Sequence, residues 1–310
     1  MHIKIATRRS PLALWQAEHV SAELKRLDPS VTTELVKIMT RGDKILDVPL
    51  AKVGGKGLFT KEIDAALLDG RADIAVHSMK DVPTELPDGT GIRAYPLRED
   101  PRDAVATITG GPLNTLPAGS RIGTSSLRRI AQLREAFPTF EFQSIRGNIQ
   151  TRLSKLGNEV DAVILAAAGV HRMEMADKMH EFISVDVMLP AVAQGTLGIQ
   201  TRNDDHELNA LVDQLNDTDT VDRTRAERAF LATLEGGCQV PIAAYATLDG
   251  DTLHLRGLVG EVDGSRVLRG ERTGSRRDGA ALGVSLANEI LDAGGRDILA
   301  RLYAAEADKP

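Results

Sequence analysis

The sequence is poor in cysteine, aromatic residues and long apolar runs, and each shortage excludes a class of protein. One cysteine in 310 residues cannot form an intramolecular disulfide, so nothing ties the chain to an oxidising compartment. Aromatic residues make up 3% of the chain, too few for the stacking platforms that bind single-stranded nucleic acid. The longest apolar run covers residues 162–170 and is too short to span a bilayer.

The chain also lacks an excess of basic residues. It has 38 Lys+Arg against 44 Asp+Glu, a net charge of −6, whereas nucleic-acid and anionic-membrane surfaces depend on a broad basic field. The apolar stretch after Arg8 ends at Gln16, too early for the core of a signal peptide. The seven histidines show no metal-ligand spacing. We therefore expect a cytoplasmic protein without nucleic-acid, membrane or metal partners, in which any basic site is local.

The first part of the chain alternates short apolar runs with amphipathic stretches, a pattern typical of a wound α/β layer. Ser10 and Pro11 provide an N-cap and a first helical residue, and Thr60 is predicted to cap a second helix. The expected strands cover residues 3–6, 33–39 and 73–76. The first expected helix runs from residue 11 to Pro29, and the second covers residues 61–68. Residues 40–59 show no regular pattern, and so long a loop in a compact domain is usually functional.

A second α/β lobe follows Pro101, and a third region closes the chain. Expected strands at 121–123, 140–145 and 162–165 alternate with helices at 125–137 and 149–156. A strand at 196–200 would return the chain to the first lobe, which leaves a hinge of two crossovers. After a helix at 218–234, strands at 242–248, 253–259 and 266–272 indicate a small α+β domain. We therefore predict domain 1 at residues 1–98 and 196–215, domain 2 at 99–195 and domain 3 at 216–310.

Basic side chains gather where the predicted strands end. Ligands of open α/β sheets bind at the carboxyl ends of strands and at helix N-termini. The residues at those places are Arg8, Lys80, Asp81, Ser126, Arg128, Arg129, Arg146, Arg152 and Arg172, with Lys52 and Lys56 in the long loop. Cations at equivalent ends of two lobes favour a ligand with several carboxylates or phosphates.

Each of these residues also has a plainer interpretation. A charged residue after a strand is often an ordinary solvated loop residue. Arg128 and Arg129 lie about 100° apart on a helix, so one of them can serve structure while the other faces the cleft. Ser125 is more simply a helix N-cap than a ligand, and Asp81 is either a functional carboxylate among cations or a capping or salt-bridged residue.

Cys238 stands between a helix end and a strand, in the segment EGGCQVP. A free cysteine is often a small buried hydrophobic residue. Two glycines before it and a proline after it instead favour a constrained, accessible loop, which suits a nucleophile or an attachment point.

Nine segments of the chain carry a family resemblance. They are RRSPLALWQ (8–16), TRGD (40–43), LAKVGGKGLF (50–59), ADIAVHSMKDVP (72–83), EDPRD (99–103), GTSSLRR (123–129), RGNIQTR (146–152), LPAVAQG (189–195) and LEGGCQVP (234–241). In this order they resemble the porphobilinogen deaminases, also called hydroxymethylbilane synthases. The resemblance covers nearly the whole chain and weakens only after Pro241.

The resemblance implies a transferase that joins four porphobilinogen units head to tail with loss of ammonia, primed by a covalent dipyrromethane. It implies two lobes like type II periplasmic binding proteins and a small third domain. Cys238 would carry the cofactor through a thioether and Asp81 would be the catalytic carboxylate. The implied cofactor-binding residues are Lys80, Ser126, Arg128, Arg129 and Arg146, the substrate-binding residues Arg8, Ser10, Gln16, Arg152, Arg172 and Gln194, and the lid residues Lys52, Lys56 and Phe59.

The chemistry of that reaction agrees with the residue types. Loss of ammonia from porphobilinogen leaves a cation that Asp81 can stabilise, and every added ring brings two carboxylates that arginine forks match. Two other classes of function remain open. A two-lobed anion-binding protein without chemistry would carry no cofactor mass, and a nucleic-acid module would show salt-dependent binding to unrelated sequences. The family resemblance implies a monomer.

Overall fold

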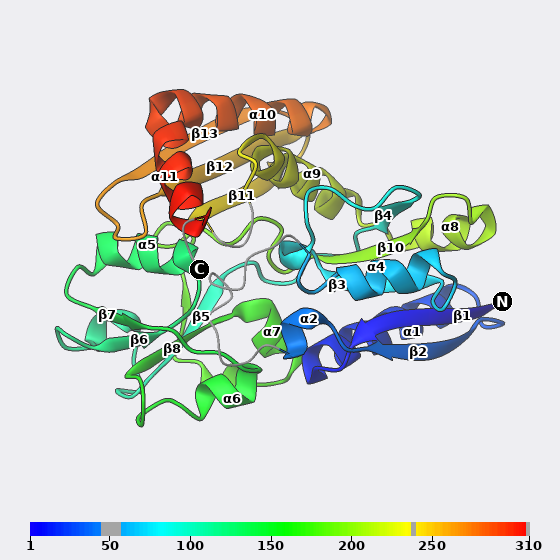
Figure 1. The fold of residues 1–310 in the computed structure, drawn as a ribbon, viewed down its shortest axis with the longest axis horizontal. Helices are drawn as coiled ribbons and strands as arrows, with labels where there is room; N and C mark the ends of the chain where they lie inside the picture. Colours follow the sequence, from blue (N-terminus) through cyan, green and yellow to red (C-terminus); the bar gives the residue numbers. More distant parts are fainter. Residues whose placement is uncertain (45–56, 237–239, 308–310) are drawn as a thin grey trace. The chain divides into compact units, whose positions relative to one another are not determined.

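The computed structural model describes residues 1–44, 57–236 and 240–307 (Figure 1). These residues form two compact units. Of the described residues, unit 1 holds 1–44, 57–99 and 195–221, and unit 2 holds 100–194, 222–236 and 240–307.

Unit 1 is built on a five-stranded sheet in the order β2-β1-β3-β10-β4. Its strands are β1 (His2–Arg8), β2 (Thr32–Ile38), β3 (Ile74–Ser78), β4 (Thr90–Ala94) and β10 (Leu197–Arg202). Its helices are α1 (Pro11–Leu27), α2 (Arg41–Lys44), α4 (Lys61–Leu68), α8 (His206–Val212) and the 3₁₀ turns η1 (Met79–Asp81) and η4 (Asp213–Leu215). Strand β1 is parallel to β2 and β3, whereas β10 is antiparallel to both β3 and β4.

Helix α1 begins where the sequence predicts. Ser10 is the N-cap, its hydroxyl oxygen accepts a hydrogen bond from the Ala13 backbone N–H at 3.4 Å, and Pro11 is the first helical residue. The helix ends at Leu27, before Asp28 and Pro29, because a proline cannot continue the backbone hydrogen bonding.

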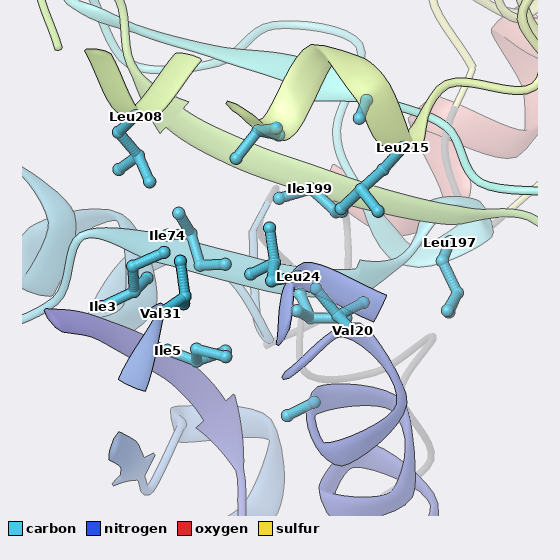
Figure 2. Packing of buried hydrophobic residues seen from close by; sticks show 14 residues of the cluster. Ile3, Ile5, Val20, Leu24, Val31, Ile74, Leu197, Ile199, Leu208 and Leu215 are labelled. Carbon is cyan, nitrogen blue, oxygen red and sulfur yellow. The ribbon is translucent and has the colours of Figure 1, made fainter. Parts of the chain in front are cut away.

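The core of unit 1 packs α1 against the sheet (Figure 2). Ile5, Ile74 and Ile199 come from three different strands and are fully buried, and Leu24 of α1 lies among them. Leu208 of α8 and Leu215 of η4 belong to the same cluster. Strand β3 is apolar and buried along most of its length because side chains cover both faces of the sheet.

Unit 2 contains a second five-stranded sheet, in the order β7-β6-β8-β5-β9. Its strands are β5 (Asp103–Thr107), β6 (Arg121–Gly123), β7 (Glu141–Gln143), β8 (Ala162–Ala166) and β9 (Glu181–Ile183). The helices around it are α5 (Leu127–Ala136), α6 (Ile149–Leu153), α7 (Ala167–Arg172) and the turns η2 (Leu113–Thr115) and η3 (Ala176–Lys178). Strand β6 is parallel to β7 and β8, and β5 is antiparallel to β8 and β9.

The two sheets share one topology. In each, three parallel strands are followed by an antiparallel strand in the fourth position, β10 in unit 1 and β5 in unit 2. Each of these strands is the first that the chain forms after it crosses from the other unit. This exchange of a strand is the type II periplasmic-binding-protein topology, so the predicted fold class and the predicted return strand are confirmed.

The last part of unit 2 is an antiparallel three-stranded sheet with helices. It contains β11 (Ile242–Asp249), β12 (Thr252–Gly260), β13 (Val267–Ser275), α10 (Gly279–Ile290), α11 (Arg296–Ala307), the turn η5 (Arg276–Asp278), the π-helical turn η6 (Leu291–Gly295) and most of α9 (Thr218–Thr233). Leu189 packs with Ala243 and Leu258 in a shared apolar cluster. The small α+β region is therefore confirmed, while the division into three domains at the stated boundaries stays a prediction.

Some local expectations are wrong. Thr60 stands at the start of α4, but its side chain makes no capping hydrogen bond. Ser125 is not the cap of α5: Ser126 holds that position, and the Ser125 hydroxyl donates instead to the Ile145 carbonyl at 2.7 Å. The strands β4, β5 and β9 were not among those expected, because antiparallel partners far along the chain, rather than a long apolar run, define them.

Candidate functional site

A pocket in unit 1 lies at the carboxyl ends of two neighbouring parallel strands. Strand β1 ends at Arg8 and β3 ends at Ser78, and because the two strands run parallel these ends share one edge of the sheet. The pocket lining includes Arg8, Gln16, Phe59, His77, Ser78 and Asp81. The structure thus brings together four residues that the sequence predicts for the site: Arg8, Gln16, Phe59 and Asp81.

The Gln16 side chain is held between α1 and β3. Its Nε2 donates to the Ser78 hydroxyl at 2.9 Å, and the residue is buried. Ser10 caps the same helix, so the predicted binding residue Ser10 fixes the start of the element that carries Gln16. Contact of Ser10 and Gln16 with substrate stays a prediction.

Asp81 presents an unpaired carboxylate to the pocket. It ends the short turn η1, which the Val82 backbone N–H closes by donating to the Met79 carbonyl at 3.2 Å. Among the residues that the structure describes, the Asp81 side chain has no hydrogen-bond or ion-pair partner. A carboxylate with its lone pairs unused can accept N–H donors from a ligand. Lys80, the preceding residue, is half-buried.

Arg8 already pairs with a carboxylate of the protein. Its Nε lies 3.1 Å from Asp43 Oδ1, and its Nη2 donates to the same oxygen. Burial alone would raise the pKa of Asp43, but the hydrogen bonds and charge of Arg8, together with donors from Thr40, lower it overall. The Arg8 guanidinium is therefore fixed on one edge.

His77 belongs to a buried polar network. The Gln200 amide nitrogen donates to Asp64 Oδ1 at 3.0 Å and to the Thr90 hydroxyl at 2.9 Å, so its oxygen faces His77 and accepts from His77 Nε2 at 2.8 Å. Burial lowers the pKa of His77, against the opposing influence of Gln200, Asp64 and Asp81. The imidazole is therefore held neutral beside the pocket.

In unit 2 the predicted binding residues follow three parallel strands. Ser126 comes after β6, Arg146 after β7, and Arg172 ends the helix that follows β8. Arg172 is buried and Arg146 is half-buried. The Ser126 hydroxyl makes no capping bond, and Arg152 Nε donates to the Gly147 carbonyl at 2.9 Å.

Arg128 and Arg129 both turn to Asp103, which lies fully buried at the start of β5. Arg129 donates to Asp103 Oδ1 through Nε at 3.1 Å and Nη2 at 2.7 Å, and its Nη1 donates to the Ile164 carbonyl at 2.9 Å. Arg128 Nη1 lies 2.8 Å from Asp103 Oδ2 and donates to the Leu189 carbonyl at 2.6 Å. Both arginines thus contact the same buried carboxylate, and the expected split, with one arginine serving structure and the other facing a cleft, stays a prediction.

The guanidiniums of Arg128 and Arg129 differ in how many of their nitrogens have hydrogen-bond partners. Arg128 Nε is buried without a hydrogen-bond partner, whereas Arg129 uses all three of its nitrogens. Burial alone would raise the pKa of Asp103, but the two adjacent guanidiniums hold it far below its usual range. Two cations thus share one buried anion, which leaves a positive excess that suits an added carboxylate.

Gln194 supports the same group. Its Nε2 lies 3.0 Å from Asp103 Oδ1 and donates to the Pro101 carbonyl at 2.7 Å. Gln194 is buried. Its predicted contact with substrate stays a prediction, while the structure shows it bridging two segments of unit 2.

Three predicted site residues, Lys52, Lys56 and Cys238, lie outside the described residues. The sequence reasoning also missed the roles of Asp43, Asp103 and His77. Asp43 and Asp103 are the last residues of the segments TRGD and EDPRD, and His77 lies four residues before Asp81. Their presence in these motifs is the sequence feature that could have indicated a role at the site.

Comparison with known families bears on the whole chain. Residues 3–210 match the family described as "Porphobilinogen deaminase, dipyromethane cofactor binding domain", and residues 221–292 match "Porphobilinogen deaminase, C-terminal domain". The chain belongs to the porphobilinogen deaminase family. Membership makes it an enzyme, a transferase of porphyrin biosynthesis that acts on a small molecule, with dipyrromethane as its cofactor.

Solved structures resemble the chain at low identity. The VFT2 domain of Bordetella pertussis BvgS, as a double mutant, is 15% identical with a TM-score of 0.43, covering 69% of this chain and 86% of its own. A putative lipoprotein from Ruminococcus gnavus is 12% identical with a TM-score of 0.43, covering 71% of this chain and 93% of its own. At such scores these likenesses carry no part of the argument for this deaminase.

In residues 1–44, 57–236 and 240–307, no group of three or more His, Cys, Asp or Glu side chains is arranged to hold a metal ion. The helices in that part of the chain all fall short of the length and apolarity that crossing a membrane requires.

Proposed function

We propose that this deaminase is a hydroxymethylbilane synthase that joins four porphobilinogen units head to tail, with loss of ammonia, onto a dipyrromethane carried by Cys238. The observation that carries the proposal is the pocket in which the unpaired Asp81 carboxylate and the Arg8 guanidinium share one edge of the sheet, in a chain of the porphobilinogen deaminase family.

The side chains suit the cofactor chemically. A dipyrromethane has pyrrole N–H donors and several carboxylates. With respect to the described residues, Asp81 offers an acceptor without a partner, and Arg128 offers a buried Nε donor without one. When bound, the cofactor supplies the free pyrrole α-carbon to which the first unit is joined.

Asp81 has the central catalytic role in this proposal. When porphobilinogen loses ammonia, positive charge develops on the remaining pyrrole, and a carboxylate held nearby stabilises that charge. Asp81 sits on a turn anchored by the buried Met79, so its position does not depend on the ligand. It would also accept hydrogen bonds from pyrrole N–H groups and so orient the ring.

Cations and neutral hydrogen-bonding side chains hold the carboxylates of cofactor, substrate and growing chain. We assign this binding to Arg8, Ser10, Gln16, Lys80, Ser126, Arg128, Arg129, Arg146, Arg152, Arg172 and Gln194, and we assign Lys52, Lys56 and Phe59 to a loop over the site. Arginine suits the task because its planar fork matches a carboxylate. The growing pyrrole chain gains two carboxylates with each ring, so a large number of cations is required. The proposal includes a cytoplasmic monomer without nucleic-acid or membrane partners, as the composition and the family resemblance favour.

The cofactor arm of the proposal is tested by intact mass. Protein purified from a host that makes porphobilinogen is expected to exceed its sequence mass by two deaminated porphobilinogen units, and peptide mapping is expected to place the excess on Cys238. The matched variant Cys238→Ser is expected to carry no adduct and to make no hydroxymethylbilane. A protein at its bare sequence mass that binds polyanions would instead favour a binding protein without chemistry.

The catalytic arm is tested with Asp81→Asn. Because a single well-placed electrostatic group contributes about 10²–10³ in rate, turnover of porphobilinogen is expected to fall by at least that factor. The adduct mass and the thermal midpoint are expected to stay at their wild-type values. Near-normal turnover in an adduct-bearing Asp81→Asn protein would remove Asp81 from the reaction.

A further inference from the structure

Asp43 holds the Arg8 guanidinium by one edge. The Arg8 Nε atom lies 3.1 Å from Asp43 Oδ1 and 3.3 Å from Oδ2, and Nη2 also donates to Oδ1. Asp43 is itself fixed, because the Thr40 backbone N–H and hydroxyl both donate to its Oδ2, at 3.2 Å and 2.8 Å. Thr40 is fully buried.

Phe59 holds the same guanidinium by its face. The Arg8 Cζ lies 4.1 Å from the centre of the Phe59 ring, within the range of a cation–π contact. The ring rests on Gly42, where a Cβ atom would come within 2.1 Å of the ring carbon Cε1. The Gly42 backbone N–H also donates to the Leu58 carbonyl at 2.9 Å, which joins the two segments.

The remaining edge of Arg8 is open to a ligand. Within the described part of the chain, Arg8 Nη1 makes no hydrogen bond, and Arg8, Phe59 and Asp81 line one pocket. A guanidinium has five N–H donors, and Asp43 occupies only the Nε and Nη2 side. A second carboxylate therefore fits at Nη1.

We propose that Asp43 and Phe59 are positioning residues that hold Arg8 by edge and face, so that its Nη1 side receives one carboxylate of porphobilinogen or of the growing chain. This inference rests on the proposed function and adds to it two residues that act through Arg8. It also explains why position 42 is glycine, since any side chain there would displace the ring.

The substitution Asp43→Asn separates positioning from folding. The two Thr40 donors keep the amide oxygen on their side, so the amide NH₂ faces the Arg8 donors and repels them. The local turn survives, while Arg8 loses its fixed edge.

The test is a double-mutant cycle on the adduct-bearing enzyme, with the adduct checked by intact mass. Asp43→Asn is expected to raise the KM for porphobilinogen about tenfold and to change kcat less than about threefold. This pattern is expected because Asp43 acts through Arg8 on substrate binding and not on the chemical step. In an Arg8→Ala background the same substitution is expected to change KM less than about twofold, because its target is gone. A purely structural Asp43 would give the same factor in both backgrounds.

The matched control is Asp69→Asn. Asp69 pairs with Arg71 on the surface of the same unit, with Arg71 Nε 2.8 Å from Oδ2, and lies outside the pocket. The KM of the Asp69→Asn enzyme for porphobilinogen is expected to equal that of the wild type. An Asp43→Asn enzyme with unchanged or lowered KM overturns the inference while leaving the proposed function intact, whereas a wild-type protein that does not consume porphobilinogen overturns both.

A second pair of variants tests the face contact independently, should Asp43→Asn fail to fold. Gly42→Ala places a methyl group in the Phe59 ring and is expected to raise KM severalfold. In a Phe59→Ala background the clash is absent, so adding Gly42→Ala is expected to leave KM unchanged. If Gly42→Ala raises KM equally in both backgrounds, or in neither, Phe59 does not position Arg8.

Discussion

At the scale of the residue, the arginines of this protein are shared between the fold and the site. Arg8 pairs with Asp43, and Arg128 and Arg129 share Asp103. Such a pairing orders a long side chain before any ligand arrives, which reduces the entropy that ligand binding must offset. Lysine cannot replace arginine at these positions, because a compact ammonium does not serve two carboxylates in a fixed plane.

Arg128 is the better candidate of its pair for ligand binding. Its Nε is buried and unpartnered, whereas the Arg129 nitrogens contact Asp103 and the Ile164 carbonyl. A buried donor without a partner costs about 1–3 kcal/mol, a penalty that a ligand carboxylate would relieve. Arg129 then holds Asp103 in place and adds its positive charge to the pair.

His77 predicts a pH dependence of stability. Its pKa in the folded protein lies below that of the unfolded chain, so acid protonates the unfolded chain first and the free energy of unfolding decreases as pH falls below about 6.5. A tenfold difference in proton affinity corresponds to about 1.4 kcal/mol. The pH dependence disappears well above that pH, where the imidazole is neutral in both the folded and the unfolded chain.

The measurement compares urea midpoints at about pH 7.5 and about pH 5. His77→Gln keeps an N–H donor for Gln200 and is expected to lose less stability than the wild type over this range, because it has no group that titrates there. The exposed His206→Gln is the control and is expected to follow the wild type. Equal losses in all three proteins would show that His77 is not excluded from protonation.

At the scale of the element, helix α9 joins the turn before Gly195 to the third sheet. Glu227 lies fully buried on α9. Its Oε2 accepts from the Ala193 backbone N–H at 2.6 Å and its Oε1 from the Ala246 backbone N–H at 2.9 Å. Ala193 has a φ of 57°, a strained conformation for a residue with a Cβ, which the Glu227 bond helps to hold.

Glu227→Gln is expected to destabilise the protein by about 1.5–3 kcal/mol, because one of the two backbone donors would face the amide NH₂ instead of an oxygen. The measurement is the urea midpoint, with Glu289→Gln as the control. Glu289 pairs with Arg272 at the surface, where loss of an ion pair costs about 1 kcal/mol or less. A Glu227→Gln protein as stable as the control would contradict the bridging role.

At the scale of the whole molecule, a chain of net charge −6 concentrates cations where parallel strands end. Strand β1 ends at Arg8 in unit 1, and in unit 2 Arg146 follows β7 and Arg172 ends the helix that follows β8. The two sheets have the same strand order, so each unit supplies the same kind of edge. The duplicated topology thus gives each unit a sheet edge at which basic residues gather.

The sequence by itself determined the local elements and the family. Caps, prolines and apolar runs placed α1, α9, β3 and β8 closely, because these signals act over a few residues. The ordered motifs also identified the deaminase family, which the family comparison confirms. The positions of Arg8 and Asp81 at the ends of predicted strands were enough to place both residues in one site.

Only the tertiary structure decided the partners of the charged groups. Asp43 lies 35 positions from Arg8, and Asp103 lies 26 from Arg129, so no local pattern indicates that they meet. The strands β5 and β10 likewise take their places from partners across the chain. The buried Asp103 requires its arginine partners, because a buried charge is stable only beside an opposite one.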